Sequence, residues 1–311
     1  MELIRGLHNL QPRHRGCVAT IGAFDGVHLG HQAVIRHLLE KARELGLPSV
    51  VIVFEPLPRE YLTPLAAPAR LMSFREKFAA LSDMGVERVL RIRFSEQLRN
   101  KSAQSFVDEV FVEGLGVRYI VLGDDFRFGN DRQGDAEFIK AQGPRNNYQA
   151  GATETLEFDG ERVSSTRIRK ALEEADFELA EALLSRPYSI AGKVVYGRQL
   201  GGQLGFPTAN LQLHRLRAAL SGVFVVSVEG PGLAGAKGVA NVGTRPTVDE
   251  SIKANLEVHL LDIDVNLYGK HIKVTFLHKL REEQKFASVE QLREQIAKDI
   301  TTAREWFAGQ D

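Results

Sequence analysis

The chain has 311 residues, of which 43% are hydrophobic and 26% charged, as in a globular protein large enough for two domains. Its 40 basic and 40 acidic residues cancel, so we do not expect a nucleic acid as the main partner. The single cysteine, Cys17, excludes an intrachain disulfide. We find neither a signal peptide nor a run of roughly 18 apolar residues, so we expect a cytoplasmic protein without a membrane partner. Weak self-association into a homo-oligomer stays open.

The first half of the chain alternates short apolar strands with helices. We predict strands at residues 18–24, 49–54, 88–92 and 119–123, and helices at residues 31–45, 74–84 and 103–115. This alternation predicts βαβ units and therefore an α/β domain with a doubly wound sheet. Ligands bind beyond the carboxyl ends of the strands in such sheets, and segments 22–31, 55–58 and 123–129 lie there.

The second half has a different pattern, in which Gly, Pro and Asn separate short strands. We predict these strands at residues 194–196, 222–228, 237–241, 254–262 and 271–277. Such a pattern is typical of an antiparallel β-barrel or sandwich. The tail from Ser288 to Trp306 has helical spacing, and we expect it to seal one end of the barrel. We place the domain boundary near Ser185, which gives domains of residues 1–186 and 187–311.

The segment Gly22–His31, GAFDGVHLGH, falls between a predicted strand and a predicted helix. A glycine-rich turn that leads into a helix N-terminus forms an anion site, because free N–H groups and the helix dipole attract phosphate. His28 and His31 share one face of that helix and suit the stabilisation of charge on a reacting phosphate. The alternative is a turn whose histidines only cap and pack.

Two further segments of the first half carry chemistry. Gly123–Gly129, GDDFRFG, follows a strand directly; Phe128 suits stacking on a flat ring, and the alternative is a solvated turn with a packed Phe. Arg162–Arg169, RVSSTRIR, precedes a helix. Its hydroxyls, N–H groups and arginines suit a triphosphate, and the alternative is a helix cap with surface arginines.

The second half contains Gly205–Asn210, GFPTAN, in which Thr208 and Asn210 offer the hard oxygen ligands that Mg²⁺ prefers. Glu257 lies between Leu256 and Val258 on an alternating strand. An inward carboxylate at this position needs a reason, because its burial is unfavourable. Accepting a proton from a primary hydroxyl is one reason, and a salt bridge at the barrel mouth is the alternative.

These segments resemble, in the same order and over nearly the whole chain, the motifs of prokaryotic FAD synthetases, which are bifunctional riboflavin kinases and FMN adenylyltransferases. The resemblance implies that a nucleotidyltransferase-like Rossmann domain of residues 1–186 adenylylates FMN to FAD and releases pyrophosphate. It also implies that residues 187–311 phosphorylate riboflavin to FMN. The small-molecule partners would be riboflavin, FMN and ATP, with Mg²⁺ accompanying the ATP. FMN and FAD would be substrates and products rather than prosthetic groups.

The resemblance also implies roles for individual residues. The catalytic residues would be His28, His31 and Glu257. The residues that bind ATP or phosphate would be Gly22, Phe24, Gly30, Arg162, Ser165, Thr166, Arg169, Gly205, Thr208 and Asn210. The metal would be held by Thr208 and Asn210, and the flavin by Asp125, Phe128 and Phe54.

Two positions depart from the family pattern: Leu57 replaces a His, and Gly202 stands where an Arg-Gly-Arg element usually contributes. Two other functions stay open. A nucleotidyltransferase of the pantetheine-phosphate or nicotinate type explains the histidines but leaves the second half without a role. A flavin-binding sensor without catalysis is the other, and the presence of both histidines, Asn210 and Glu257 argues against it.

Overall fold

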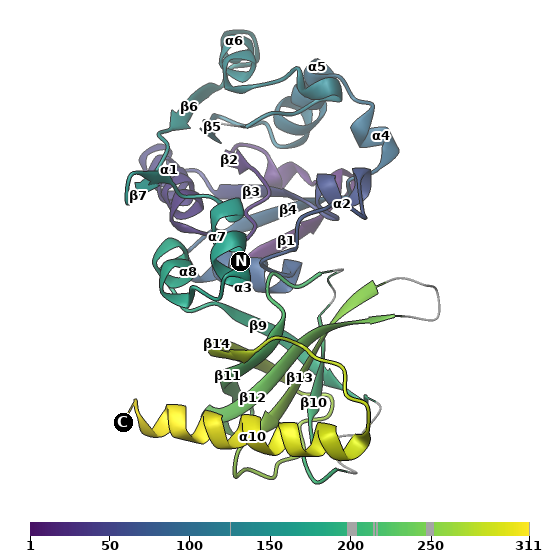
Figure 1. Ribbon diagram of the computed structural model, residues 1–311. Helices are drawn as coiled ribbons and strands as arrows, with labels where there is room; N and C mark the ends of the chain where they lie inside the picture. Colours follow the sequence, from purple (N-terminus) through teal and green to yellow (C-terminus); the bar gives the residue numbers. More distant parts are fainter. Residues whose placement is uncertain (125, 198–203, 214, 216, 247–251, 311) are drawn as a thin grey trace. The chain divides into compact units, whose positions relative to one another are not determined.

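The computed structural model describes residues 1–311 except residues 125, 198–203, 214, 216, 247–251 and 311 (Figure 1). The chain forms two compact units. Unit 1 comprises Met1–Pro68 and Phe74–Ser164, and unit 2 comprises Ala69–Ser73 and Ser165–Asp311. The short segment Ala69–Ser73 therefore belongs with the second half of the chain. The division into functional domains near Ser185 remains a prediction.

A six-stranded parallel sheet forms the centre of unit 1, in the order β1-β4-β3-β2-β5-β6 (Figure 1). Its strands are β1 (Glu2–Arg5), β2 (Val18–Ile21), β3 (Ser49–Phe54), β4 (Arg88–Ile92), β5 (Tyr119–Gly123) and β6 (Gln149–Thr153). The helices of unit 1 include α1 (Leu29–Leu45), α2 (Pro58–Leu62), α3 (Phe74–Asp83), α4 (Glu96–Arg99), α5 (Ala103–Phe106), the π-helix η3 (Val107–Gly114) and α6 (Ala136–Asn146). A small hairpin pairs β7 (Glu157–Phe158) with β8 (Glu161–Arg162).

This architecture confirms the expected doubly wound α/β fold. Ala19 and Ile21 of β2 belong to a core with Phe106 and Val110, while α1 contacts β2 from the other side. All four residues of β2 are buried as a result, which explains its continuous apolar sequence. The edge strands β1 and β6 were not predicted, because neither contains an apolar run.

The order of the strands positions two of the sequence motifs. The chain passes from β2 to β3 and β4 on one side of β2 and returns on the other side as β5 and β6. The carboxyl ends of β2 and β5 therefore flank the switch point at which such sheets bind ligands. Gly22–His31 follows β2, and Gly123–Gly129 follows β5.

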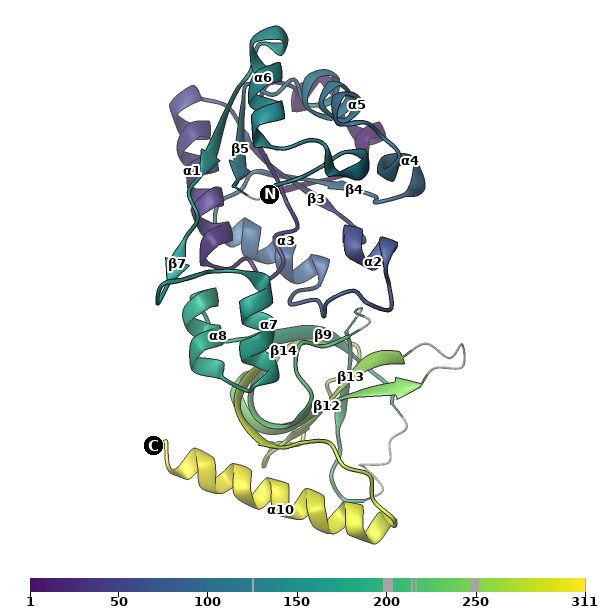
Figure 2. The ribbon, with the colours of Figure 1, turned by 45° about the horizontal axis from the view of Figure 1, so that its top comes forward.

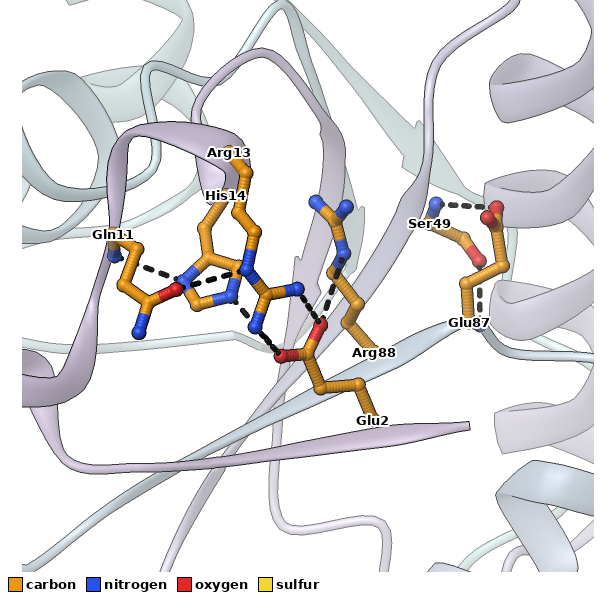
Figure 3. Close-up of polar contacts among 7 residues, drawn as sticks. All are labelled: Glu2, Gln11, Arg13, His14, Ser49, Glu87 and Arg88. Atoms are coloured by element: carbon orange, nitrogen blue, oxygen red, sulfur yellow. Dashed lines mark hydrogen bonds and ion pairs between the residues drawn. The ribbon is translucent and has the colours of Figure 1, made fainter.

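Polar contacts join neighbouring segments at the other end of the sheet, where the strands begin (Figure 3). Glu2 accepts hydrogen bonds from Arg13 at 2.6 and 3.1 Å and from Nε2 of the buried His14 at 3.1 Å. The hydrogen bond from Arg13 is the main reason that the pKa of Glu2 is lowered. Ser49 and Glu87 exchange hydrogen bonds at 3.1 and 3.0 Å, which join the beginnings of β3 and β4. These side-chain contacts therefore stabilise the amino ends of the strands, whereas the sequence motifs follow the carboxyl ends.

Unit 2 confirms the expected antiparallel barrel. Six strands form a closed barrel in the order β10 (Ala209–Gln212), β13 (Ile252–Leu260), β12 (Leu233–Pro246), β11 (Gly222–Gly230), β14 (His271–Arg281) and β9 (Ser189–Val195). The helices of unit 2 include α7 (Ser165–Glu173), α8 (Phe177–Leu184) and the C-terminal α10 (Val289–Ala308). None of the described helices is both long enough and apolar enough to cross a membrane.

Helix α10 packs along the outer face of the barrel (Figure 2). Val223 and Val225 of β11 cluster with Ala303 and Phe307 of α10. The same face of β11 continues to the exposed Glu229, so it is the outside of the barrel. The expectation that this helix seals the barrel end is therefore wrong. The apolar stripe of α10 packs instead against apolar residues on the outer face of the strands.

Cys17 provides a test of the packing in unit 1. Its side chain has no exposed surface, and burial raises the pKa of its thiol to about 12. Because the thiolate is the reactive species, iodoacetamide should modify Cys17 in the native protein roughly 10³-fold more slowly than in urea. Mass spectrometry of timed samples measures both rates. Equal rates would contradict the described core.

Candidate functional site

The histidine pair lies where α1 begins. His28 is the N-cap of α1, and its Nδ1 accepts a hydrogen bond from the His31 N–H at 3.3 Å. This cap starts the helix at Leu29, two residues earlier than predicted. The two imidazole rings stack with centroids 3.6 Å apart and an interplanar angle of 19°. Both rings therefore lie at the positive end of the helix dipole, where an anion is stabilised.

Glycines allow the rings to occupy this position. A β carbon on Gly30 would lie 3.3 Å from the His28 ring and 3.6 Å from the carbonyl oxygen of Val163. A β carbon on Gly22 would lie 3.1 Å from the ring of Phe24. Gly30 thus permits a close approach between the histidine and the chain just before α7. The three residues predicted to contact ATP here, Gly22, Phe24 and Gly30, are parts of one loop and helix start.

The environment of His31 favours its neutral form. The pKa of His31 lies well below its usual range, first because of burial and then because of the neighbouring His28 and Lys77. Nδ1 of His31 is buried, and no described residue forms a hydrogen bond with it. Since Nδ1 of His28 accepts a hydrogen bond, a neutral His28 carries its proton on Nε2. The two rings can therefore donate hydrogen bonds while at least His31 is uncharged.

The segment after β5 meets the segment before α7. Asp124 accepts a hydrogen bond from Nη2 of Arg162 at 3.0 Å and another from the hydroxyl of Thr155. These contacts join two motifs that lie far apart in the sequence. Asp125, predicted to bind the flavin, lies outside the described residues.

The predicted flavin-binding phenylalanines differ in exposure. Phe128 is 6% exposed and stacks on Phe126 with ring centroids 5.4 Å apart. Phe54 is partly buried at the end of β3, and the centroid of its ring lies 6.3 Å from that of Phe106. Phe54 therefore offers more open surface than Phe128. Leu57, the departure from the family pattern, is the N-cap of the short helix α2.

Three predicted phosphate-binding residues belong to unit 2. Ser165 and Thr166 begin α7, as predicted from their hydroxyls. Arg169 follows on the same helix, and its Nε donates a hydrogen bond to the carbonyl oxygen of Ala69 at 2.5 Å. This contact ties α7 to the segment Ala69–Ser73 within unit 2.

A second site is a cavity of about 320 Å³ between the outer face of the barrel and α10. The predicted residues that line it are Thr208, Asn210 and Glu257. Other residues that line it, from β12, β14, the loop after β14 and α10, include Asn241, Arg281, Glu283, Phe286, Ile296 and Asp299. The structure thus brings together two motifs of the second half that are about fifty residues apart in the sequence.

Glu257 occupies the middle of a polar row that crosses three strands. It is paired in register with Asn210 of β10 and with Asn241 of β12. Its Oε1 accepts a hydrogen bond from Nδ2 of Asn255 at 2.9 Å. Its neighbours Leu256 and Val258 are buried on the opposite face. The carboxylate therefore faces the cavity outside the barrel, and the expectation of an inward carboxylate is wrong.

Asn210 and Thr208 fit a hard cation. Oδ1 of Asn210 is buried, and no described residue forms a hydrogen bond with it. A β carbon on Gly197 would lie 2.5 Å from this amide, so the glycine gives the side chain its space. His259 Nδ1 donates to the Pro207 carbonyl oxygen at 2.9 Å and holds the GFPTAN turn against β13. An oxygen without a partner, beside a hydroxyl on a fixed turn, matches the ligands that Mg²⁺ prefers.

Sequence reasoning missed the ion pair that closes this cavity. Arg281 at the end of β14 donates to both carboxylate oxygens of Asp299 on α10, with a shortest distance of 2.7 Å. Gln295 donates to the same carboxylate at 2.9 Å. The available signal was the position of Asp299, which falls among Leu292, Ile296 and Ala303 on the apolar stripe of the predicted helix.

Comparisons with known proteins identify relatives of both halves of the chain. The family model of FAD synthetase matches residues 10–167, and that of riboflavin kinase matches residues 184–307. A Pseudomonas fluorescens protein named bifunctional riboflavin kinase/FMN adenylyltransferase is 54% identical over 98% of this chain and 97% of its own length. A protein of the same name from Escherichia coli K12 is 47% identical over 99% and 98%. A solved structure titled macrolide-efflux protein, from Streptococcus pneumoniae, is 32% identical with a TM-score of 0.78 and covers 98% of this chain and 100% of that chain.

The lowered pKa of His31 predicts a pH dependence of stability. Below about pH 6.5 the unfolded chain protonates this side chain while the folded state resists protonation, so the folded state loses stability as the pH falls. His31→Gln removes this contribution. Between pH 7 and 5 the wild type should lose more unfolding free energy than the variant, by at most about 1.4 kcal/mol per pH unit. Urea unfolding followed by circular dichroism measures this difference, and parallel curves would contradict the interpretation.

Proposed function

The chain belongs to the bifunctional riboflavin kinase/FMN adenylyltransferase family, and we propose that its two sites divide the two reactions between them. The enzyme phosphorylates riboflavin to FMN with ATP, and it adenylylates FMN to FAD with a second ATP. We assign FMN adenylylation to residues 1–186 and riboflavin phosphorylation to residues 187–311. The positions of the two family matches, at residues 10–167 and 184–307, support this assignment.

In adenylyl transfer, a phosphate oxygen of FMN forms a bond to the α-phosphorus of ATP as the bond to the departing pyrophosphate breaks. The FMN phosphate is already a competent nucleophile, so this step needs no strong base. It needs stabilisation of the charge that develops on the α-phosphate and on the leaving group. We assign this role to His28 and His31. The observation that supports it is the stacking of the two rings at the N-terminus of α1, where burial favours the neutral form of His31.

Other residues would bind the two substrates of this reaction. The loop and helix start that contain Gly22, Phe24 and Gly30 would contact ATP. Charged and hydroxyl contacts to its phosphates would come from Arg162, Ser165, Thr166 and Arg169, of which Arg162 would exchange its partner Asp124 for phosphate. The flavin would lie against Phe54 and Phe128, with Asp125 nearby, once Phe126 rotates away from the Phe128 ring.

In the kinase reaction, the 5′-hydroxyl oxygen of riboflavin forms a bond to the γ-phosphorus of ATP, and ADP leaves. We propose that Glu257 accepts the hydroxyl proton, and its position in the cavity beside Asn210 supports this role. Thr208 and Asn210 would hold Mg²⁺, and Gly205 would let the turn approach the phosphates. Bound there, the cation would neutralise charge on the transferred phosphate. The apolar part of the cavity, including Phe286 and Ile296, suits the flavin ring.

We also propose a reducing compartment, the cytoplasm, as the place of action. The one cysteine of the chain is buried and unpaired, so the fold requires no oxidising environment. Riboflavin, FMN and ATP would be the small molecules that it meets there.

The double substitution His28→Ala with His31→Ala tests the adenylyl site. It should abolish FAD formation from FMN, because loss of each stabilising donor typically lowers the rate on the order of 10²–10³. FMN formation from riboflavin should continue, since that reaction uses the other site. Chromatographic separation of the flavins measures both rates in one sample. Equal loss of both reactions would contradict the division between the two sites.

The substitution Glu257→Gln tests the kinase site, because it preserves the shape of the side chain and removes the base. Riboflavin phosphorylation should fall by roughly 10²–10⁴, the range for removal of a general base. FMN supplied directly should still become FAD. Asp262→Asn, which neutralises an exposed carboxylate near the end of the same strand, is the matched control and should leave both rates unchanged. Near-normal phosphorylation in a folded Glu257→Gln variant would refute the role of Glu257.

A further inference from the structure

A buried lysine supports the loop that carries the histidine pair, and none of the sequence motifs includes it. We propose that Lys77 is a positioning residue for adenylyl transfer, because its ammonium group fixes the backbone of the loop between β2 and α1. The inference rests on the proposed role of His28 and His31. It goes beyond that role by assigning a function to α3, which carries no predicted site residue.

Lys77 lies on the inner side of α3. Lys77 and Leu81, one helical turn apart, are the buried residues of this helix, and Lys77 is only 1% exposed. A lysine is almost never buried to this degree unless its ammonium is hydrogen-bonded. Its Nζ donates a hydrogen bond to the carbonyl oxygen of Ala23 at 2.5 Å. Since the ammonium group is buried against the backbone of the loop, we assign its effect on the reaction to the position of that loop.

The loop needs such support because its backbone is strained. Phe24 and Val27 have φ angles of 45° and 42°, in the left-handed region that side chains rarely adopt. Val27 is β-branched, which makes this conformation more unfavourable still. Strained residues persist only where the surroundings hold them in place. Lys77 holds the carbonyl group just before Phe24, and Nε2 of Gln32 holds the carbonyl oxygen of Val27 at 3.0 Å.

The strained residues are directly connected to the catalytic pair. His28 follows Val27 in the chain, and the ring of Phe24 lies 5.2 Å from that of His31. The positive charge of Lys77 also reaches the pair, since it is one of the causes that lower the pKa of His31. Release of Ala23 would therefore shift both the ring positions and the local charge. Both changes weaken stabilisation of the transition state rather than binding of the ground state.

The variant Lys77→Met, in the full-length enzyme, tests this inference because it keeps the length of the side chain and removes the donor. We expect kcat of FAD formation from FMN to fall by about 10- to 100-fold, the effect of a catalytic group misplaced by about 1 Å. KM for ATP and for FMN should change less than about threefold, because the interaction acts on the transition state. Leu81→Val, on the same buried side of α3, is the matched control and should retain kcat within about twofold.

Two further measurements make the result decisive. Protection of Cys17 from iodoacetamide shows that unit 1 is folded in each variant. His28→Ala with His31→Ala, measured in the same assay, tests the proposed function separately. Loss of FAD formation in that variant but an unchanged kcat in folded Lys77→Met would overturn the inference alone. Unfolding of unit 1 in Lys77→Met, or a rise in KM without a fall in kcat, would overturn it as well. Retained FAD formation in the double histidine variant would overturn the proposed function itself.

Discussion

Two imidazole rings with centroids 3.6 Å apart repel each other if both are charged, and the site in unit 1 depends on avoiding that state. Burial keeps His31 neutral, and the cap formed by His28 directs the proton of a neutral ring to Nε2. The rest of the local structure serves this arrangement. Gly30 leaves space for the His28 ring, and Lys77 holds the strained loop. An anion at this helix end would therefore meet the positive end of the dipole beside a neutral His31, which suits the adenylyl transfer that we propose for this site.

Unit 2 forms its site by a different route. Apolar side chains fill the barrel interior, and the residues that we propose for the kinase reaction lie on the outer face, beneath α10. The Arg281–Asp299 ion pair and the apolar cluster around Val225 and Phe307 hold the helix over that face. Pairing of β10, β13 and β12 then places Asn210, Glu257 and Asn241 in one row. Because paired residues share a face, register alone brings the proposed metal ligand next to the proposed base.

Local patterns in the sequence predicted most of the fold. Strand β3 and helix α1 were recognised because apolar runs and helical spacing report burial directly. Strand β10 was missed because it begins within GFPTAN, whose glycine, proline and polar residues are typical of a turn. Helix α10 was placed at the barrel end because helical spacing shows that a helix has an apolar face but not which surface that face contacts. The candidate site residues lie within motifs that the sequence displays, whereas Lys77 and Asp299 lie outside them, since each forms its contact with a residue distant in the sequence. The outward orientation of Glu257 depends on the closure of the barrel, which alternation alone does not reveal.

The central claim is that one chain carries two sites that act in sequence, with FMN as the product of one and the substrate of the other. A time course with riboflavin, ATP and Mg²⁺, resolved by chromatography, tests this claim most directly. The account predicts that FMN accumulates first and that FAD then appears together with pyrophosphate, with one ADP released for each riboflavin consumed. ATP turnover without any flavin product, or FAD formed from riboflavin while added labelled FMN stays unconverted, would contradict it.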